Sequence, residues 1–504
     1  MADEVSSEAE LYRRLSGLEI RTRTELREDL RTTPLLTLAV KNSVEKGSND
    51  ARHESGLDEL LGREKIFNQY AVLGFHAGQC PGIRKNEPIL MNVDAPNSVF
   101  ICGSQGSGKS YTLNCMLENC LIADERIGQV TLPVAGVAFH YDLNSAGSVA
   151  ETAYLCSMGI RVKVLVSQSN EHALRIAYSK LPDARKYLTV APLLLHSSDL
   201  SIERMHRLMA FADKETSMPL YMSVALRVLR QMAIDAKGDA FDYLKFRRAL
   251  ESEHLTKEQL GPLGLRLELL ESFLDLPTAK GKRVSRNLLD LEPGTLTIFD
   301  LTDPFIDAST VCILFDICLS LVEEYRPSCG LLVALDEAHK YMTMSLAATN
   351  LTDRLLGTIR EQRHNGTRVI IATQEPTVSE KLLDLCTTSI IHRFTSPAWF
   401  SAIQNHLGAA SKLVSSVSEQ HAMFNRIMNL KVGESLVFAP SAFLCLAEPG
   451  GEVSTLGREA ISMKSRTRLG SDGGKSVLIS MEAGSDGNLE QSLDDSSPIT
   501  SRMI

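Results

Sequence analysis

Short apolar segments alternate with amphipathic segments through the middle of the chain. The apolar segments are rich in β-branched and aromatic side chains, which is typical of buried strands. Between them, apolar residues recur at helical spacing, as in the stretch that contains Leu113, Met116 and Leu117. This alternation predicts an α/β fold, in which helices flank a mostly parallel sheet. The predicted strands are residues 99–102, 134–141, 162–166, 296–299, 331–335, 368–373, 389–394 and 435–438.

The alternation is interrupted once and fades at both ends of the chain. Between about residues 167 and 291, Leu, Met and Ala recur at helical spacing, which predicts a mostly helical insertion. Residues 1–62 are rich in charged and hydroxyl side chains and predict a charged, partly helical or disordered N-terminal extension. Residues 464–504 carry few large apolar side chains and predict a disordered tail. The folded domain is therefore expected over residues 63–463.

Composition narrows the class of protein. The chain has 504 residues, and its apolar content of 44% is that of an ordinary folded protein. No apolar run approaches the ~20 residues that a membrane-spanning helix needs, and residues 1–10 lack the apolar core of a secretory signal. The ten cysteines form no CxxC pair, which is typical of a reducing compartment. We therefore expect an intracellular, soluble protein, in the cytoplasm or the nucleus, without a membrane partner.

The net charge of −9 gives the chain no overall attraction for nucleic acid. A ring-shaped assembly can nevertheless confine its basic residues to a central channel. Charge by itself therefore leaves the substrate open.

The segment Gly103-Ser-Gln-Gly-Ser-Gly-Lys-Ser110 matches the phosphate-loop pattern (Walker A) in full, and it lies between a predicted strand and a predicted helix. Its glycines allow backbone conformations that a Cβ would forbid, so that successive N–H groups converge on a phosphate. Lys109 would reach the β and γ phosphates of ATP, and the Ser110 hydroxyl would bind Mg²⁺. The residues predicted to bind ATP are Gly103, Ser104, Gln105, Gly106, Ser107, Gly108, Lys109, Ser110 and Tyr111.

A second motif follows the apolar strand at residues 331–335, which ends in Asp336 and Glu337 (Walker B). Asp336 is predicted to hold Mg²⁺ through water, and Glu337 to polarise the attacking water as a general base. The simpler interpretation is a helix N-terminus capped by acids. The presence of a phosphate loop in the same chain favours a site that hydrolyses ATP.

Further polar residues flank the next predicted strand. Gln374 follows residues 368–373, where an amide can contact the γ-phosphate or the attacking water, and we predict a sensor role for it. Before the strand, Arg360 and Arg363 end a helix that Gly366 closes. These arginines are either charges that complement the helix C-terminus or a finger offered to a neighbouring subunit.

These residues in this order resemble the HerA/FtsK group of P-loop ATPases, and in particular its HerA-like branch, over about residues 97–438. The resemblance is carried by the phosphate loop, by Asp142 and Asp300 after their strands, by the segment from Leu335 to His339, and by the segment from Arg360 to Gln374. It implies a RecA-like P-loop NTPase sheet whose Walker B strand lies one strand away from the phosphate-loop strand. It also implies Mg²⁺-dependent ATP hydrolysis by a hexameric ring that moves along double-stranded DNA, with Arg393 contacting nucleotide across the subunit interface.

Two features depart from the HerA pattern, and one is the long helical insertion after Asp142. The other is the N-terminal region. HerA proteins carry an N-terminal β-barrel, whereas residues 1–90 here are helix-like and charged.

Two other functions are alternatives to a DNA-translocating motor. Residues 336–339 spell the box of DEAH-type helicases, but only 130 residues follow Gln374, which is short for the second RecA-like domain of such helicases. An ATP-dependent switch or scaffold that acts on protein partners without nucleic acid is the stronger alternative. A GTPase switch is disfavoured because the chain lacks an Asn-Lys-x-Asp motif.

Overall fold

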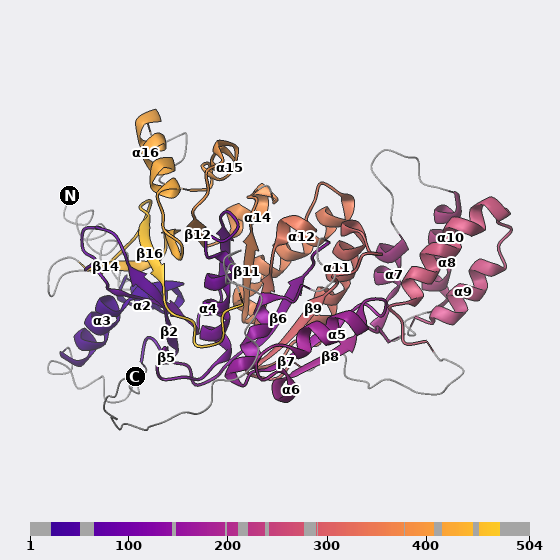
Figure 1. The fold of residues 1–504 in the computed structure, drawn as a ribbon, viewed down its shortest axis with the longest axis horizontal. Helices are drawn as coiled ribbons and strands as arrows, with labels where there is room; N and C mark the ends of the chain where they lie inside the picture. The colour runs from indigo at the N-terminus through magenta and orange to yellow at the C-terminus, as the bar shows by residue number, and fades with distance from the viewer. Residues whose placement is uncertain are drawn as a thin grey trace, which may run out of the picture.

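The computed structural model describes most of the chain and shows one continuous sheet with helices on both faces (Figure 1). The predicted α/β class is therefore confirmed. The residues that the structure describes are 22–50, 65–143, 148–196, 199–209, 220–236, 241–276, 289, 291–376, 378–407, 416–446 and 453–473.

One half of the sheet has the order β13-β12-β4-β11-β10-β6-β9-β7-β8, and every neighbouring pair in it is parallel except β12 with β13. β11 lies between β4 and β10, so the Walker B strand is one strand away from the phosphate-loop strand, as predicted. All eight predicted strands are present in this half. β8 is a further strand of this half that was not predicted. The bounds of all these strands are β4 Ser98–Cys102, β6 Ala135–His140, β7 Arg161–Val166, β8 Leu188–Pro192, β9 Thr295–Asp300, β10 Leu331–Leu335, β11 Thr367–Thr373, β12 Thr388–His392 and β13 Glu434–Phe438.

Successive side chains of each strand enter opposite cores, because strand side chains alternate between the two faces of a sheet. In β4, Val99 and Ile101 pack with α4 (Lys109–Leu121), η2 (Glu151–Met158) and α5 (Glu171–Ser179). Phe100 and Cys102 face the other core, which is filled by α11 (Ala308–Glu324), α12 (Leu346–Arg360) and α14 (Glu380–Leu385). Burial on both faces explains why these strands read as continuous apolar runs.

The other half of the sheet has the order β15-β14-β1-β3-β2-β16, continues from β13 through β16, and is largely antiparallel. A small separate core that includes Leu36, Leu90 and Phe443 lies beneath it. Its elements are α2 Thr22–Thr32, β1 Leu35–Thr37, α3 Leu38–Asp50, β2 Tyr70–His76, β3 Pro88–Asn92, β5 Gly128–Gln129, β14 Phe443–Leu446, β15 Val453–Thr455 and β16 Ile461–Ser465.

This half corrects three predictions about the chain ends. The extension predicted at residues 1–62 contributes β1 to the sheet, and residues 1–90, which were expected to be helix-like, contain three strands. The tail predicted from residue 464 is ordered as far as residue 473, because β16 crosses that boundary and the next residues pack on α4. Residues 1–21 and 474–504 lie outside the described residues. The hydrophobic pattern did not predict these strands, because they are short, contain few apolar residues and pair with strands from distant parts of the chain.

The helical insertion is present but begins later than predicted. After α5 and α6 (Ala184–Tyr187), β8 pairs with β7, so that the sheet continues past residue 167. The helices of the insertion are α7 Ile202–Met209, α8 Leu220–Ala236, α9 Tyr243–Glu251 and α10 Lys257–Glu271.

Buried Asp316 of α11 ties the insertion to the sheet domain. Its carboxylate accepts hydrogen bonds from Arg207 of α7 and Arg354 of α12, each at 2.5 Å. An ionised carboxylate held by two guanidinium groups fixes the angle between these helices.

Two further helices, α15 (Pro397–Ile403) and α16 (Val417–Met428), lie beside the antiparallel half in Figure 1. Among the helices of the described residues, none combines the length and the apolar content that crossing a bilayer requires.

Candidate active site

The phosphate loop leaves β4 and enters α4, as the motif predicted. Gly106 and Gly108 have φ values of 70° and 110°, which side chains with a Cβ rarely adopt. A Cβ at Gly103 would lie 2.6 Å from Cβ of His392, so this glycine is required for close packing against β12. The loop thus forms a backbone cradle at the N-terminus of α4, where the N–H groups of the first turn are available to an anion.

Side chains of the loop and of its neighbours fix this cradle. Ser107 donates to the carbonyl of Ser104 at 2.7 Å, and the hydroxyl of Ser104 donates to the carbonyl of Arg393 at 2.8 Å. The N–H of Gly433 donates to the carbonyl of Ser107 at 3.1 Å. The Gln105 side chain is exposed at the tip of the loop. The loop is therefore held by β12 and by the start of β13.

Lys109 is buried at the base of the loop, and its Nζ donates to the carbonyl of Ser104 at 3.2 Å. Burial lowers the pKa of Lys109, while Glu337 and Asp336 oppose that shift. The cation is thus placed close to both acids of the Walker B strand. A triphosphate in the cradle would supply the counter-charge that this buried ammonium lacks.

Asp336 and Glu337 lie at the end of β10, at the same edge of the sheet as the phosphate loop. Buried Asp336 lies 3.7 Å from Nδ1 of His140, which ends β6. Glu337 has φ 49°, a left-handed conformation that costs a non-glycine residue about 1–3 kcal/mol. Backbone strain of this kind is found at active sites, and here it lies at the predicted general base.

Gln374 is brought to Glu337, although 37 positions separate them. Its Nε2 donates to Oε1 of Glu337 at 3.2 Å, and its backbone N–H lies 3.4 Å from Nδ1 of His339. His339 follows Glu337 in the turn η4 (Ala338–Lys340), and burial lowers its pKa, which favours a neutral ring. Oε2 of Glu337 is buried and has no hydrogen-bond partner among the described residues. That oxygen lies 3.4 Å from Nδ1 of His339, and a hydrogen-bond donor such as a water molecule would satisfy it.

Glu151 is an acid of this site that the sequence did not reveal. It begins η2, and its carboxylate accepts a hydrogen bond from Arg468 at 3.0 Å. Burial raises the pKa of Glu151 to about 7, and Arg468 and the neighbouring Ser110 hydroxyl oppose the shift. No motif marks this position, and no sequence signal could have found it.

The three predicted arginines do not meet at this site. Arg360 ends α12 and Arg363 lies in α13 (Gln362–Asn365), immediately before β11 begins. The start of β11 is about 20 Å from its end, where Gln374 lies. Both side chains are exposed at the edge opposite the phosphate loop. Arg393 is exposed beside its own chain's loop, where only its carbonyl contacts Ser104.

Three other residues named in the sequence analysis have structural contacts. Asp300 is buried and accepts from the hydroxyl of Tyr178 at 2.6 Å, which ties β9 to α5. Asp142 forms an ion pair of 3.1 Å with Lys340. The hydroxyl of Tyr111 accepts from the N–H of Arg468 at 2.8 Å, so the Tyr111 side chain contacts the C-terminal segment.

The residues present fit a magnesium nucleotide. The cradle has the glycine conformations and the buried lysine that bound phosphate requires, and the orphaned Glu337 oxygen lies at its edge. Ser110 and Asp336 offer the hydroxyl and carboxylate oxygens that Mg²⁺ prefers, with phosphate and water as its other ligands.

No family model and no curated protein matches the sequence. Among solved structures, the chain is similar to VirB4 of Thermoanaerobacter pseudethanolicus, with a TM-score of 0.51 and 13% identity over 80% of this chain and 97% of VirB4. Two other solved structures give a TM-score of 0.28 and 11% identity. These are the pCW3 conjugation coupling protein TcpA (81% of this chain, 68% of TcpA) and the genome packaging NTPase B204 of Sulfolobus turreted icosahedral virus 2 (69% of this chain, 93% of B204).

The match to VirB4 shows the fold of the chain. In that fold the phosphate loop lies between β4 and α4, where the motif predicts it.

Proposed function

We propose that this protein hydrolyses ATP in a Mg²⁺-dependent reaction and uses the energy to move along double-stranded DNA as a ring of identical subunits. The observation that carries the hydrolysis step is the contact between Gln374 and Glu337 at the edge of the phosphate cradle. A carboxylate with one oxygen held by Gln374 and the other without a hydrogen bond would orient and deprotonate a water molecule.

Each residue of the site has a part in the proposed reaction. The loop N–H groups and Lys109 bind the β and γ phosphates and neutralise charge that develops during transfer. Ser110 and Asp336 would hold Mg²⁺, which supplies further neutralisation of phosphate charge when bound. Glu337 accepts the proton of the attacking water, and Gln374 keeps the carboxylate in position.

The positions of the arginines support the ring. Arg360 and Arg363 are exposed at the edge of the sheet opposite their own nucleotide site. A guanidinium so far from its own phosphate loop would contact nucleotide only at the site of a neighbouring subunit, as an arginine finger does. Arg393, exposed beside its own loop, remains a candidate for a contact across the same interface.

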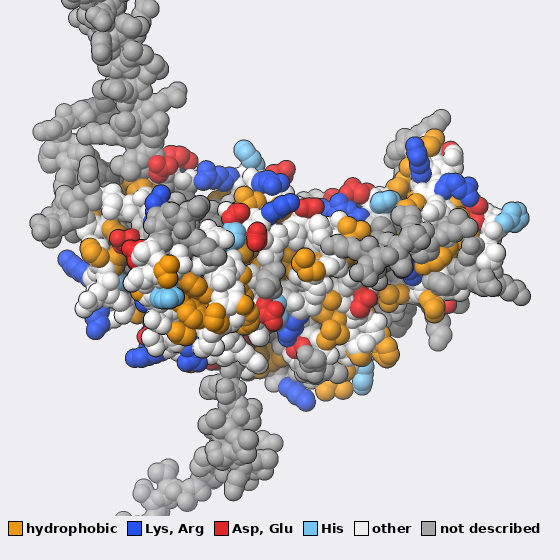
Figure 2. Space-filling model, turned by 90° about the horizontal axis from the view of Figure 1, so that it is seen from above, with side chains coloured by type: hydrophobic (Ala, Val, Ile, Leu, Met, Phe, Trp, Pro, Cys, Tyr) orange, Lys and Arg blue, Asp and Glu red, His pale blue; other side chains and the backbone are white. Residues whose placement is uncertain are grey.

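The proposed substrate follows from the resemblance to HerA/FtsK motors. On the face shown in Figure 2, Lys and Arg side chains lie among Asp and Glu side chains and form no single basic patch. DNA would therefore bind where the ring brings basic residues together in its channel, and a monomer would bind it weakly.

The test is steady-state ATP hydrolysis with and without double-stranded DNA, with Glu337→Gln as control. Stimulation by DNA that is lost in Glu337→Gln is the expected result. If DNA does not change the rate of ATP hydrolysis, the result favours the alternative function, an ATP-dependent switch or scaffold for protein partners. A strictly monomeric protein in ATP and Mg²⁺ with full turnover would refute the ring.

A further inference from the structure

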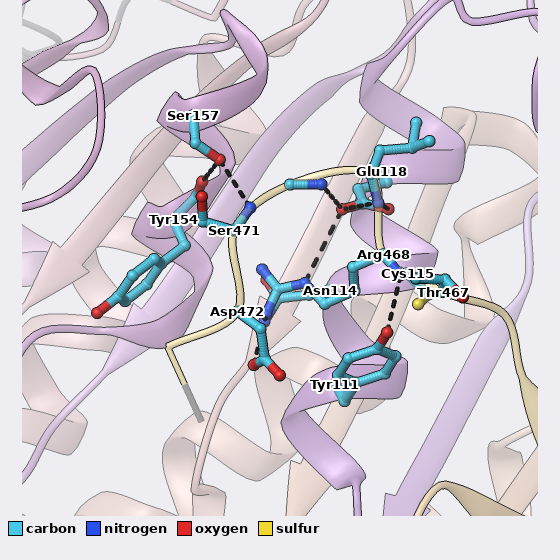
Figure 3. Close-up of polar contacts among 12 residues, drawn as sticks. Tyr111, Asn114, Cys115, Glu118, Tyr154, Ser157, Thr467, Arg468, Ser471 and Asp472 are labelled. Atoms are coloured by element: carbon cyan, nitrogen blue, oxygen red, sulfur yellow. Dashed lines mark hydrogen bonds and ion pairs between the residues drawn. The ribbon is translucent and has the colours of Figure 1, made fainter. Parts of the chain in front are cut away.

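The chain beyond β16 lies across α4, and Figure 3 shows Arg468 of this segment beside Glu118, Tyr111 and Asp472. Arg466 and Arg468 are both buried. We call residues 466–473 the C-terminal strap. Arg466 donates to buried Glu118 at 2.8 Å and to Asn119 at 2.9 Å. Glu118 also accepts from the N–H groups of Leu469 and Gly470. These contacts fully satisfy one carboxylate of α4 and account for the attachment of the strap.

Arg468 makes a different set of contacts, which lead to the nucleotide site. Its Nη1 donates to Glu151 at 3.0 Å, and its guanidinium lies 5.8 Å from the centre of the Tyr111 ring. Nε and Nη2 of Arg468 are buried and make no hydrogen bond to any described residue. Arg468 also forms longer ion pairs with Glu118 at 3.9 Å and with Asp472 at 3.7 Å. Arg466 and the strap backbone already bind Glu118 more closely, so attachment does not depend on Arg468 alone.

Glu151 connects Arg468 to the phosphate loop. Burial and the charge of Asp336 raise the pKa of Glu151, and the Ser110 hydroxyl lowers it. Glu151 in turn raises the pKa of Lys109, which burial lowers. The Glu151 side chain is 21% exposed, so water can reach it. The carboxylate therefore lies on the side of the cradle where Mg²⁺ would be bound.

We propose that Glu151 is a positioning residue for the Mg²⁺ of the bound nucleotide and that Arg468 of the C-terminal strap holds it in place. A hydroxyl that donates its proton to Glu151 presents its lone pairs to the metal. The second Glu151 oxygen can accept from water in the Mg²⁺ shell. This inference rests on the proposed function, because it concerns the same magnesium nucleotide.

Replacing Glu151 should affect nucleotide binding differently with and without Mg²⁺. With Mg²⁺ present, loss of the carboxylate weakens nucleotide binding, because Ser110 and the water shell lose their acceptor. Without Mg²⁺, the same loss leaves binding unchanged or strengthens it, because an anion near the phosphates is removed. The ratio of the two dissociation constants therefore reports on Glu151, and it does not depend on the fraction of protein that is folded.

The experiment measures binding of a fluorescent ATP analogue in Mg²⁺ and in EDTA. For Glu151→Gln we expect the ratio of the dissociation constants in EDTA and in Mg²⁺ to fall about 10-fold, as for other residues that orient metal ligands. Arg468→Met should lower the ratio in the same direction. The double variant should resemble Glu151→Gln alone, because Arg468 acts through Glu151. Arg466→Met is the matched control, since it removes the other buried arginine of the strap without touching Glu151.

An unchanged ratio in Glu151→Gln would overturn the proposal. Effects of Glu151→Gln and Arg468→Met that add in the double variant would show that Arg468 does not act through Glu151. A reduced ratio in Arg466→Met would show that any loosening of the strap is sufficient. If the wild-type protein binds no nucleotide, the proposed function itself fails, and that result is distinct from the other three.

Discussion

His392 lies beneath the phosphate loop, and its Nε2 is 3.0 Å from the hydroxyl of Thr112 in the first turn of α4. Its Nδ1 lies 3.0 Å from the carbonyl of Glu434, so both ring nitrogens have partners within the protein. Burial lowers the pKa of His392 to about 4, and the charge of Lys109 adds to this shift. The ring is neutral in the folded protein at pH 7.

The low pKa of His392 predicts a loss of stability in mild acid. In the unfolded chain this histidine takes up a proton near pH 6.5, whereas in the folded protein it does so near pH 4. The stability contribution is thus complete above pH 6.5 and decreases as the pH falls to 4, by at most about 3 kcal/mol. Urea unfolding of His392→Asn between pH 7 and pH 4 should give a shallower decline than the wild-type protein. Identical slopes would contradict this assignment.

Lys109→Ala should weaken nucleotide binding. A charged hydrogen-bond donor contributes about 1.5–3 kcal/mol, which corresponds to a loss of about 10- to 100-fold in affinity. Titration of the fluorescent nucleotide measures this loss, with exposed Lys186→Ala as the control that should bind as the wild-type protein does. Equal nucleotide affinities of Lys109→Ala and the control would show that Lys109 does not bind the nucleotide.

Gln374→Ala should lower kcat with little change in KM. The amide holds Oε1 of Glu337 and does not touch the phosphate cradle, so its loss affects the direction of the base more than binding. We expect a decrease of about 10-fold or more in kcat, because a misdirected base loses part of its catalytic contribution. A variant that changes KM alone would instead indicate a role for Gln374 in substrate binding.

Glu118→Ala should destabilise the protein by about 3–5 kcal/mol, because it leaves the guanidinium of Arg466 buried without its partner. The comparison is Glu171→Ala, which breaks an exposed pair with Arg175 in α5 and should cost less than about 1 kcal/mol. Urea titration measures both. Limited proteolysis should also cut the strap more readily in Glu118→Ala, and an unaltered cleavage pattern would argue against its dependence on Glu118.

Arg360→Ala and Arg363→Ala should leave nucleotide binding intact and reduce turnover only in the assembled protein. Both side chains are exposed at the edge of the sheet opposite their own phosphate loop, so neither is expected to contact the nucleotide of its own subunit. Loss of an arginine finger lowers kcat by about 10³-fold or more. Adding subunits that carry Lys109→Ala but intact arginines should restore part of the activity. If neither variant alters turnover, these arginines are charges that complement the helix C-terminus and are not arginine fingers.

Much of the site could be predicted because its chemistry is local in the sequence. The loop from Gly103 to Ser110 lies between a strand and a helix that are adjacent in the chain, and the acids at 336 and 337 directly follow a fully buried strand. Because the carboxyl ends of parallel strands share one edge, both motifs were expected to meet there. The structure places them at that edge.

The tertiary structure alone decided the rest, because the pairings involved join distant parts of the chain. β1 is three residues long, and its residue Leu36 pairs with Leu90 and Phe443, which no local pattern reveals. Arg466 and Glu118 lie 348 positions apart, so neither predicts the other. Glu151 joins the site only because η2 packs beside α4. The sequence by itself thus determined the phosphate chemistry, whereas the meeting of remote segments determined what surrounds and supports it.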